Sequence, residues 1–145
     1  LAPPAITIAS SDMISVIRLS NNSKLTISGG VNDDGVLFMN LKNMNGNASA
    51  NIFALVPNST LILEAGVTIE IRYPKANTVN AFAFLNGNQE IVKNFEKYDG
   101  VYVQNMVDSS DENYNIIRII VGVTSTIEYD GTNIMINQKT YTDSN

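Results

Sequence analysis

The chain has 145 residues, of which 44% are hydrophobic, with nine Lys and Arg, 14 Asp and Glu, and a formal net charge of −5. This balance gives no electrostatic support for binding nucleic acid or an anionic membrane surface, and no apolar run is long enough for membrane insertion as a helix. The chain has no Cys and no His, which excludes disulfides, Cys/His zinc sites and Ser-His-Asp or Cys-His catalysis. We therefore expect one domain, residues 1–145, with no metal and no cofactor.

Short strands separated by turns are expected along the whole chain, because apolar segments alternate with stretches of Asn, Ser, Thr and Gly. Residues 67–72 alternate strictly between apolar and polar, which marks a strand with one buried side. No stretch has convincing helical periodicity. In chain order, the expected strands include residues 6–8, 17–19, 36–39, 53–55, 67–72, 83–85, 101–104, 119–121 and 133–136.

Four segments, residues 17–25, 53–61, 83–91 and 119–127, align without a gap. Two aliphatic columns recur six positions apart: Leu19, Leu55, Leu85 and Val121 form the first, and Leu25, Leu61, Ile91 and Ile127 form the second. Such a repeat predicts stacked coils. We therefore predict an all-β right-handed parallel β-helix, a solenoid of about four coils with three short strands per coil. The even strand spacing also permits a β-sandwich of the tail-fibre-head type.

One column of the alignment, in the turn between the two aliphatic positions, is rich in asparagine: it contains Asn22, Asn58 and Asn88. In stacked coils, equivalent residues lie about 4.8 Å apart, so the amides can form a hydrogen-bonded ladder. Asparagine is also common in turns for purely local reasons. We predict a structural ladder, with the local turn preference as the alternative.

A second pattern is a set of large apolar residues that alternate with the inward column: Ile52, Phe82, Phe84 and Ile120. If Leu19 and its equivalents point inward, these four lie on the outer face of the strands. An exposed apolar stripe of this kind marks an interface. The alternative is that the chain's own loops cover the stripe, or that these strands are buried on both faces.

The charged residues indicate no enzyme. Glu70 and Arg72 share the outward face of one expected strand and are expected to form a surface ion pair. Hydrolysis of glycosides needs two placed carboxylates, and no second partner for Glu70 is apparent. The acidic residues at 33–34 and 108–112 fit no calcium-binding spacing and are interpreted as solvated loop charge. We therefore predict no catalytic, metal-binding or cofactor-binding residue.

Neither end of the sequence shows an amphipathic capping helix, although Pro3 and Pro4 can block strand pairing at the start. Solenoids normally protect their end coils with atypical repeats. An uncapped solenoid of this length is expected to be a fragment or a subunit of a larger assembly.

The turn at residues 45–49, the Asn58-Ser59-Thr60-Leu61 segment and Gly66 follow a known order of turn, strand and glycine. Residues 45–71 resemble a coil of the pectin-lyase-like β-helix superfamily, in particular the adhesin-like and polymorphic-membrane-protein repeats of microbial surfaces. The resemblance implies a right-handed β-helix, a fold that phage tailspikes and extracellular polysaccharide enzymes share.

The resulting expectation is a non-enzymatic, surface-exposed structural or binding module: an adhesin repeat, or a fibre, tailspike or filament subunit. It would serve assembly or host and receptor attachment at an extracellular, cell or virion surface. The expected partners are the chain itself, as a homo-oligomer or filament, or the rest of a larger chain, and surface glycans, with no nucleic acid and no membrane insertion. The alternative is a carbohydrate-binding or polysaccharide-degrading domain on the same scaffold.

Overall fold

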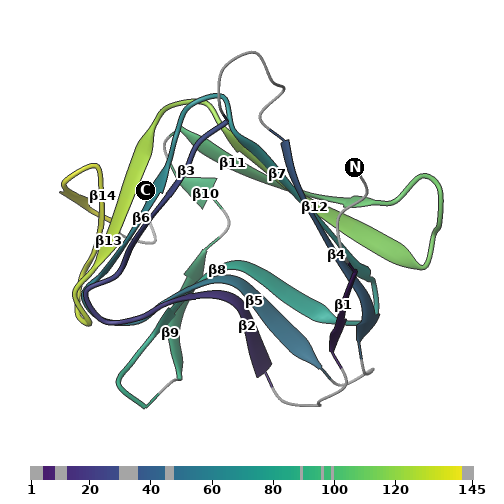
Figure 1. The fold of residues 1–145 in the computed structure, drawn as a ribbon, viewed down its shortest axis with the longest axis horizontal. Helices are drawn as coiled ribbons and strands as arrows, with labels where there is room; N and C mark the ends of the chain where they lie inside the picture. Colours follow the sequence, from purple (N-terminus) through teal and green to yellow (C-terminus); the bar gives the residue numbers. More distant parts are fainter. Residues whose placement is uncertain are drawn as a thin grey trace.

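The computed structural model describes residues 5–8, 13–29, 36–44, 48–88, 90–95, 97–98 and 100–141. These residues form strands and turns and contain no helix, so the prediction of an all-β chain is confirmed. The strands form three sheets around a common apolar interior, which gives the three-sided outline in Figure 1.

The three sheets, which we call A, B and C, have six, four and five described strands. In spatial order, sheet A contains β1 (Ala5–Ile8), β4 (Val36–Met44), β7 (Thr68–Pro74), β12 (Tyr114–Val121), β11 (Val101–Val107) and β10 (Lys97–Tyr98). Sheet B contains β2 (Met13–Leu19), β5 (Ser49–Leu55), β8 (Thr78–Leu85) and β9 (Ile91–Phe95). Sheet C contains β15 (Lys139–Thr140), β14 (Ile134–Ile136), β13 (Ser125–Tyr129), β6 (Ser59–Leu63) and β3 (Lys24–Ile27).

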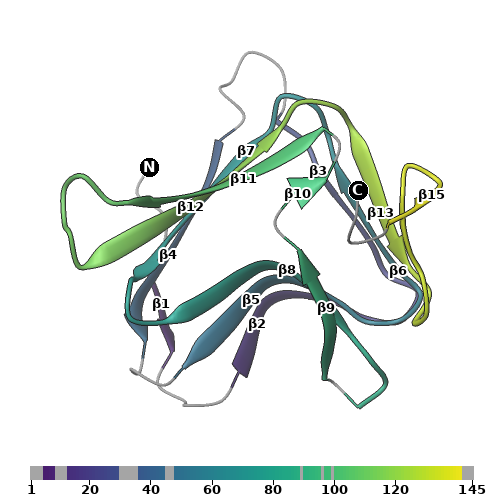
Figure 2. The same cartoon turned by 180° about the vertical axis from the view of Figure 1, so that it is seen from behind.

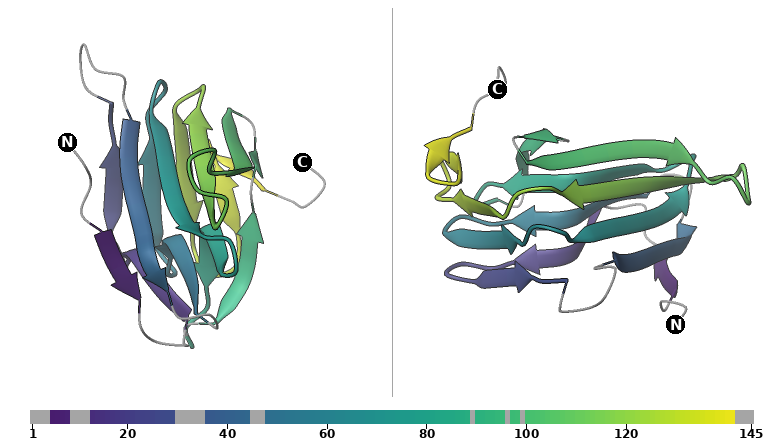
Figure 3. Two further views of the ribbon diagram at one scale, coloured as in Figure 1. Left: turned by 90° about the vertical axis from the view of Figure 1, so that its right-hand side faces the viewer. Right: turned by 90° about the horizontal axis from the view of Figure 1, so that it is seen from above.

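The first half of the chain winds through the sheets in a fixed order. From β2 to β8, consecutive strands belong to sheets B, C, A, B, C, A and B. Strands one round apart pair in parallel: β2 with β5, β5 with β8, β3 with β6, and β4 with β7. Leu19 faces Leu55 and Leu25 faces Leu61, so the predicted stacking of the first two repeats is confirmed. Figure 3 shows these rounds as adjacent layers.

After β8 the strands run the other way. β9 is antiparallel to β8, β12 is antiparallel to β7 and β11, and β13 is antiparallel to β6 and β14. The third repeat therefore stacks in parallel only through β8, and the prediction of parallel stacking is wrong for the rest of the third coil and for the fourth. The cause is a tight turn in which the Asn86 side-chain oxygen accepts hydrogen bonds from the backbone N–H groups of Asn88 and Glu90. The turn sends β9 back along β8, so Ile91 pairs with Leu85 instead of stacking on Leu61.

The interior is filled by columns of apolar side chains that cross the sheets. Leu61 and Ile127 face each other in sheet C, and Ile69 and Ile119 face each other in sheet A; all four are fully buried. Inward positions of the first round are less buried: Ile17, Leu25 and Ile27 pack against the core but stay partly exposed. The core is therefore well covered on the side of the later strands and thinly covered on the side of β2 and β3.

The two ends of the stack differ in strand pairing. The edge strands of the three sheets at one end are β1, β2 and β3, and no other described strand lies beyond them. At the other end, seen from behind in Figure 2, β9, β12 and β13 pair with the strands β8, β7 and β6 of the parallel part. The outermost described strands are therefore β9, β10 and β15 at the end where pairing is antiparallel, and β1, β2 and β3 at the end where pairing is parallel.

Candidate functional site

The outer face of sheet A carries a set of fixed charges. Arg118 on β12 lies directly opposite Glu70 on β7, and its Nε is 2.9 Å from Glu70 Oε1. Arg72 Nε lies 2.6 Å from Asp108 Oδ2, and the Arg72 guanidinium sits 3.6 Å above the Tyr114 ring. The predicted ion pair between Glu70 and Arg72 is therefore wrong, because each finds a closer partner on a neighbouring segment.

Asp108 is the most perturbed acid of the described residues. The Arg72 guanidinium, helped by hydrogen bonds from the Ser110 hydroxyl and backbone N–H, lowers the pKa of Asp108 from 3.8 to about 2. The segment from Asp108 to Asp111 is thus a hydrogen-bonded turn tied to sheet A. No described group of three or more acids is placed to hold a metal ion. Asp33 and Asp34 lie outside the described residues.

A groove of about 270 Å³ opens on the same face of sheet A, lined by Phe38, Met39, Asn40, Glu70, Arg72 and Ile116. Glu70 is the single carboxylate of this lining, and it is paired with an arginine. Such a site lacks the second carboxylate of glycoside hydrolysis. The buried Oδ1 of Asn40 has no hydrogen-bond partner, so one acceptor at the groove is unsatisfied.

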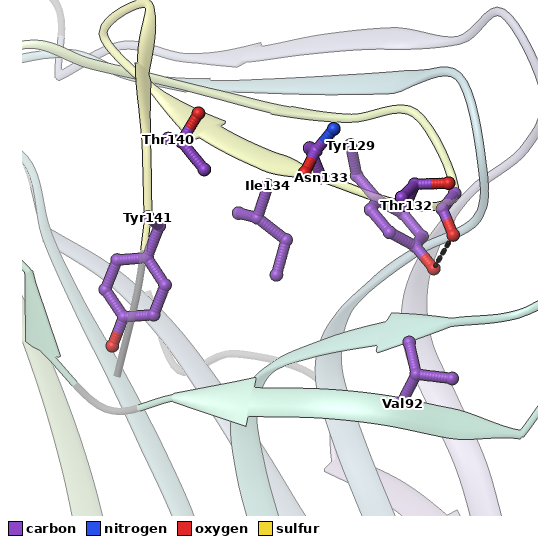
Figure 4. A pocket seen from close by; sticks show the side chains of 8 residues that line it. Val92, Tyr129, Thr132, Asn133, Ile134, Thr140 and Tyr141 are labelled. Atoms are coloured by element: carbon purple, nitrogen blue, oxygen red, sulfur yellow. Dashed lines mark hydrogen bonds between the residues drawn. The ribbon is translucent and has the colours of Figure 1, made fainter. Parts of the chain in front are cut away.

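A larger pocket of about 460 Å³ lies between β9 and the last strands, and Figure 4 shows it. Its lining comprises Val92, Tyr129, Gly131, Thr132, Asn133, Ile134, Thr140 and Tyr141. The Tyr129 hydroxyl donates a 3.4 Å hydrogen bond to the Gly131 carbonyl, and burial raises the pKa of Tyr129. The lining contains neither a carboxylate nor an amine or guanidinium, so the pocket offers neutral hydrogen-bonding groups and aromatic surface but no acid–base pair.

The predicted apolar stripe is not exposed. Ile52, Phe82 and Phe84 are fully buried, and Ile120 is partly buried. For Phe82 and Phe84 the reason is a shift of one residue in β8: Phe82 faces Phe53 and Phe84 faces Leu55, whereas the alignment placed Leu85 at that position. A one-residue slip moves every side chain of a strand to the other face. Consecutive residues of β5 and β8 are buried, so these strands are covered on both faces.

The asparagine column exists only in part. Asn22 and Asn58 are stacked through their backbones, with Asn22 N donating to Asn58 O over 2.8 Å, and both side chains are exposed. Both residues have a positive φ, 62° and 66°, which Asn tolerates better than most residues. Asn88 lies in the β8–β9 turn and does not join them. The Asn58 amide donates to Asn21 Oδ1 over 3.3 Å, an exposed contact with a residue outside the column. The predicted ladder of Asn22, Asn58 and Asn88 is therefore wrong, and the local turn preference explains the column.

Sheet B contains a hydrogen bond between two asparagine side chains that the sequence did not predict. Asn80 Nδ2 donates to Asn51 Oδ1 over 3.0 Å, and Asn51 is only 1% exposed. Ser15, Asn51 and Asn80 are aligned across β2, β5 and β8. All three residues stand two positions before an apolar residue, but the ungapped alignment places Ala81, and not Asn80, opposite Asn51, so the repeat alone did not reveal the pair.

No family model, no curated protein and no solved structure matches this chain. Among the residues that the structure describes, no helix is long and apolar enough to cross a membrane.

Proposed function

We propose that the chain is a non-enzymatic structural and binding module built as a short right-handed β-solenoid. The cyclic order of sheets from β2 to β8, with parallel pairing between rounds, supports the solenoid. In Figure 1 the path from β2 through β3 to β4 runs clockwise. Figure 3 places these early strands at the end of the stack that faces the viewer of Figure 1, so the chain winds clockwise away from the viewer, which supports the right-handed sense. A stiff stack of this kind suits a fibre, adhesin or filament at a cell or virion surface.

The observation that carries the assembly function is the difference between the two ends of the stack. At the antiparallel end, two of the three edge strands, β10 and β15, have only two residues, whereas β1, β2 and β3 present edges of four, seven and four residues at the other end. Unpaired edges are templates for further strands. The inward side chains Ile17 and Leu25 at this end are only partly covered. Burying them against another stack of strands would remove apolar surface from water, so association through this end is favourable.

The charged groove argues against catalysis, because Glu70 and Arg72 are both held in ion pairs with neighbouring residues. Light scattering over a concentration range tests the assembly function. We expect a mass above that of one 15.8 kDa chain, increasing with concentration. A mass of one chain at every concentration would contradict assembly. Release of sugar products from a polysaccharide panel, abolished by Glu70→Gln, would contradict the non-enzymatic assignment.

A second candidate function, binding of a neutral sugar, is supported by the pocket between β9 and the last strands. Thr132, Asn133 and Thr140 offer neutral hydrogen-bonding groups there, and the Tyr141 ring offers an apolar face. A glycan array with the unmodified chain and with Tyr141→Ala tests it. Sugar binding that is lost in the variant supports this function, and no binding to any glycan contradicts it.

A further inference from the structure

The most unusual exposed segment of the described chain is the first half of β4. Val36, Leu37 and Phe38 are consecutive and are 38%, 38% and 48% exposed. β7 pairs with residues 36–40 on one side of β4. On the other side β1 pairs with β4 only from Asn40 onward, so no described strand lies along that edge of residues 36–39. Residues 3 and 4 of the chain are prolines, which have no N–H to extend the β1 ladder along this stretch.

This edge is apolar on both faces of the sheet. Leu37 is aligned with Ile69 and Ile119, which are fully buried, so Leu37 belongs to the inner face. Phe38 is aligned with Glu70, so it belongs to the outer face, beside the groove. Native edge strands are usually protected by charge, proline or a bulge. Residues 36–39 carry no charge, and Glu70, the acid aligned with Phe38, is paired with Arg118.

We propose that residues 36–38 of β4 pair, antiparallel, with the same residues of a second copy of this chain about a twofold axis at Leu37. Leu37 then faces Leu37 of the second copy on the inner face. On the outer face, Phe38 of each copy faces Val36 of the other, and the two Phe38 rings are diagonal neighbours. The pairing ends before Asn40, where β1 takes over the edge.

A second copy fits this edge for two reasons. When residues 36–38 of two copies pair in antiparallel fashion, apolar side chains of one copy face apolar side chains of the other on both faces of the sheet. Such self-complementarity is what an isologous interface requires. Within residues 36–39 the pairing also brings no charges together, because none of these residues is charged and the adjacent Glu70 is paired with Arg118. The inference rests on the proposed assembly function and names the strand through which assembly occurs.

The chain has no cysteine, so a single introduced thiol gives a clean test. Residues directly opposite each other in an antiparallel pair have Cα atoms about 4.5–5.5 Å apart, within disulfide range. Leu37→Cys should therefore form a covalent dimer under mild oxidation, seen on a non-reducing gel. Val123→Cys, at a position that is 59% exposed and lies outside the strands, is the matched control and should stay monomeric.

A second variant tests the same edge without oxidation. Phe38→Lys should weaken self-association about tenfold or more, as loss of an interface anchor does, while Val123→Lys should leave it unchanged. Circular dichroism confirms that each variant is folded. If the unmodified chain associates but Leu37→Cys does not cross-link and Phe38→Lys has no effect, the β4 interface is wrong and the assembly function stands. If the unmodified chain is monomeric at every concentration, both proposals fail.

Discussion

The ring of Phe53 on β5 stacks on the ring of Phe82 on β8, with centroids 5.7 Å apart and an interplanar angle of 18°. Both side chains are fully buried, and the two residues are direct neighbours in the parallel ladder. Two residues further along β8, Phe84 meets Tyr129 of β13 edge-on, with centroids 5.3 Å apart. This aromatic column therefore links the parallel strands of sheet B to the antiparallel strands of sheet C.

Removal of the Phe82 ring should be strongly destabilising, because the surrounding strands cannot close the cavity. We expect Phe82→Ala to lower the free energy of unfolding by about 3–5 kcal/mol, measured by urea denaturation. Tyr102→Ala, at a side chain that is 58% exposed, is the control and should change it by no more than about 0.5 kcal/mol. Equal small losses in the two variants would show that Phe82 is exposed in solution, as the sequence pattern suggested.

The sequence predicted the first two rounds of strands because parallel stacking keeps a constant spacing between equivalent residues, such as Leu19 and Leu55. The same reasoning failed after Leu85, because an antiparallel return keeps the apolar spacing within each strand but reverses the direction of pairing. Ile127 was correctly grouped with Leu61, since the two do face each other, although in antiparallel strands. Glu70 was identified as an outward charge, but its partner Arg118 depends on the unforeseen pairing of β12 with β7.

The ion pair of Arg72 and Asp108 predicts a specific pH response. A carboxyl whose pKa is lowered on folding stabilises the native state above its ordinary pKa of 3.8, and this contribution is lost as the pH falls towards 2. In Arg72→Met the pKa of Asp108 should move up from about 2 towards 3.8, because the hydrogen bond that lowers this pKa most is lost. An NMR titration of the Asp108 carboxyl carbon measures both values.

The stability difference between the unmodified chain and Arg72→Met should shrink between pH 4 and pH 2, since the low pKa no longer distinguishes them once Asp108 is protonated. Arg118→Met serves as the control, because Arg118 pairs with Glu70 and not with Asp108. An unchanged Asp108 titration in Arg72→Met would contradict the assignment.

Substitutions at Asn58 separate a backbone role from an amide ladder. Its φ of 66° is unfavourable for a residue with an ordinary side chain, so Asn58→Ala should cost about 1 kcal/mol in thermal or urea unfolding. Asn58→Gly keeps the backbone conformation and should stay within about 0.5 kcal/mol of the unmodified chain. If the side-chain amide were the stabilising group, glycine would be at least as harmful as alanine.

Gly100 packs against the turn after β12. Its φ is +84°, and a Cβ at this position would lie 2.9 Å from Val123 Cβ, so Gly100→Ala should lower stability by about 1–3 kcal/mol. Gly87 has open space around it and no positive φ, and Gly87→Ala should be neutral or slightly stabilising. Differential scanning calorimetry of the two variants makes the comparison. Similar melting temperatures would contradict the close contact.

The return of the last strands onto the middle of the stack also determines when the protein can fold during synthesis. β6 and β7 obtain one of their two strand neighbours from β13 and β12, which a ribosome makes only near the end of the chain. Until residues 114–129 emerge, one edge of β6 and one edge of β7 lack their strand partner, and contacts this distant in sequence form slowly. A nascent chain halted before β12 would therefore be the species most prone to aggregate, although it already contains every strand of the parallel half.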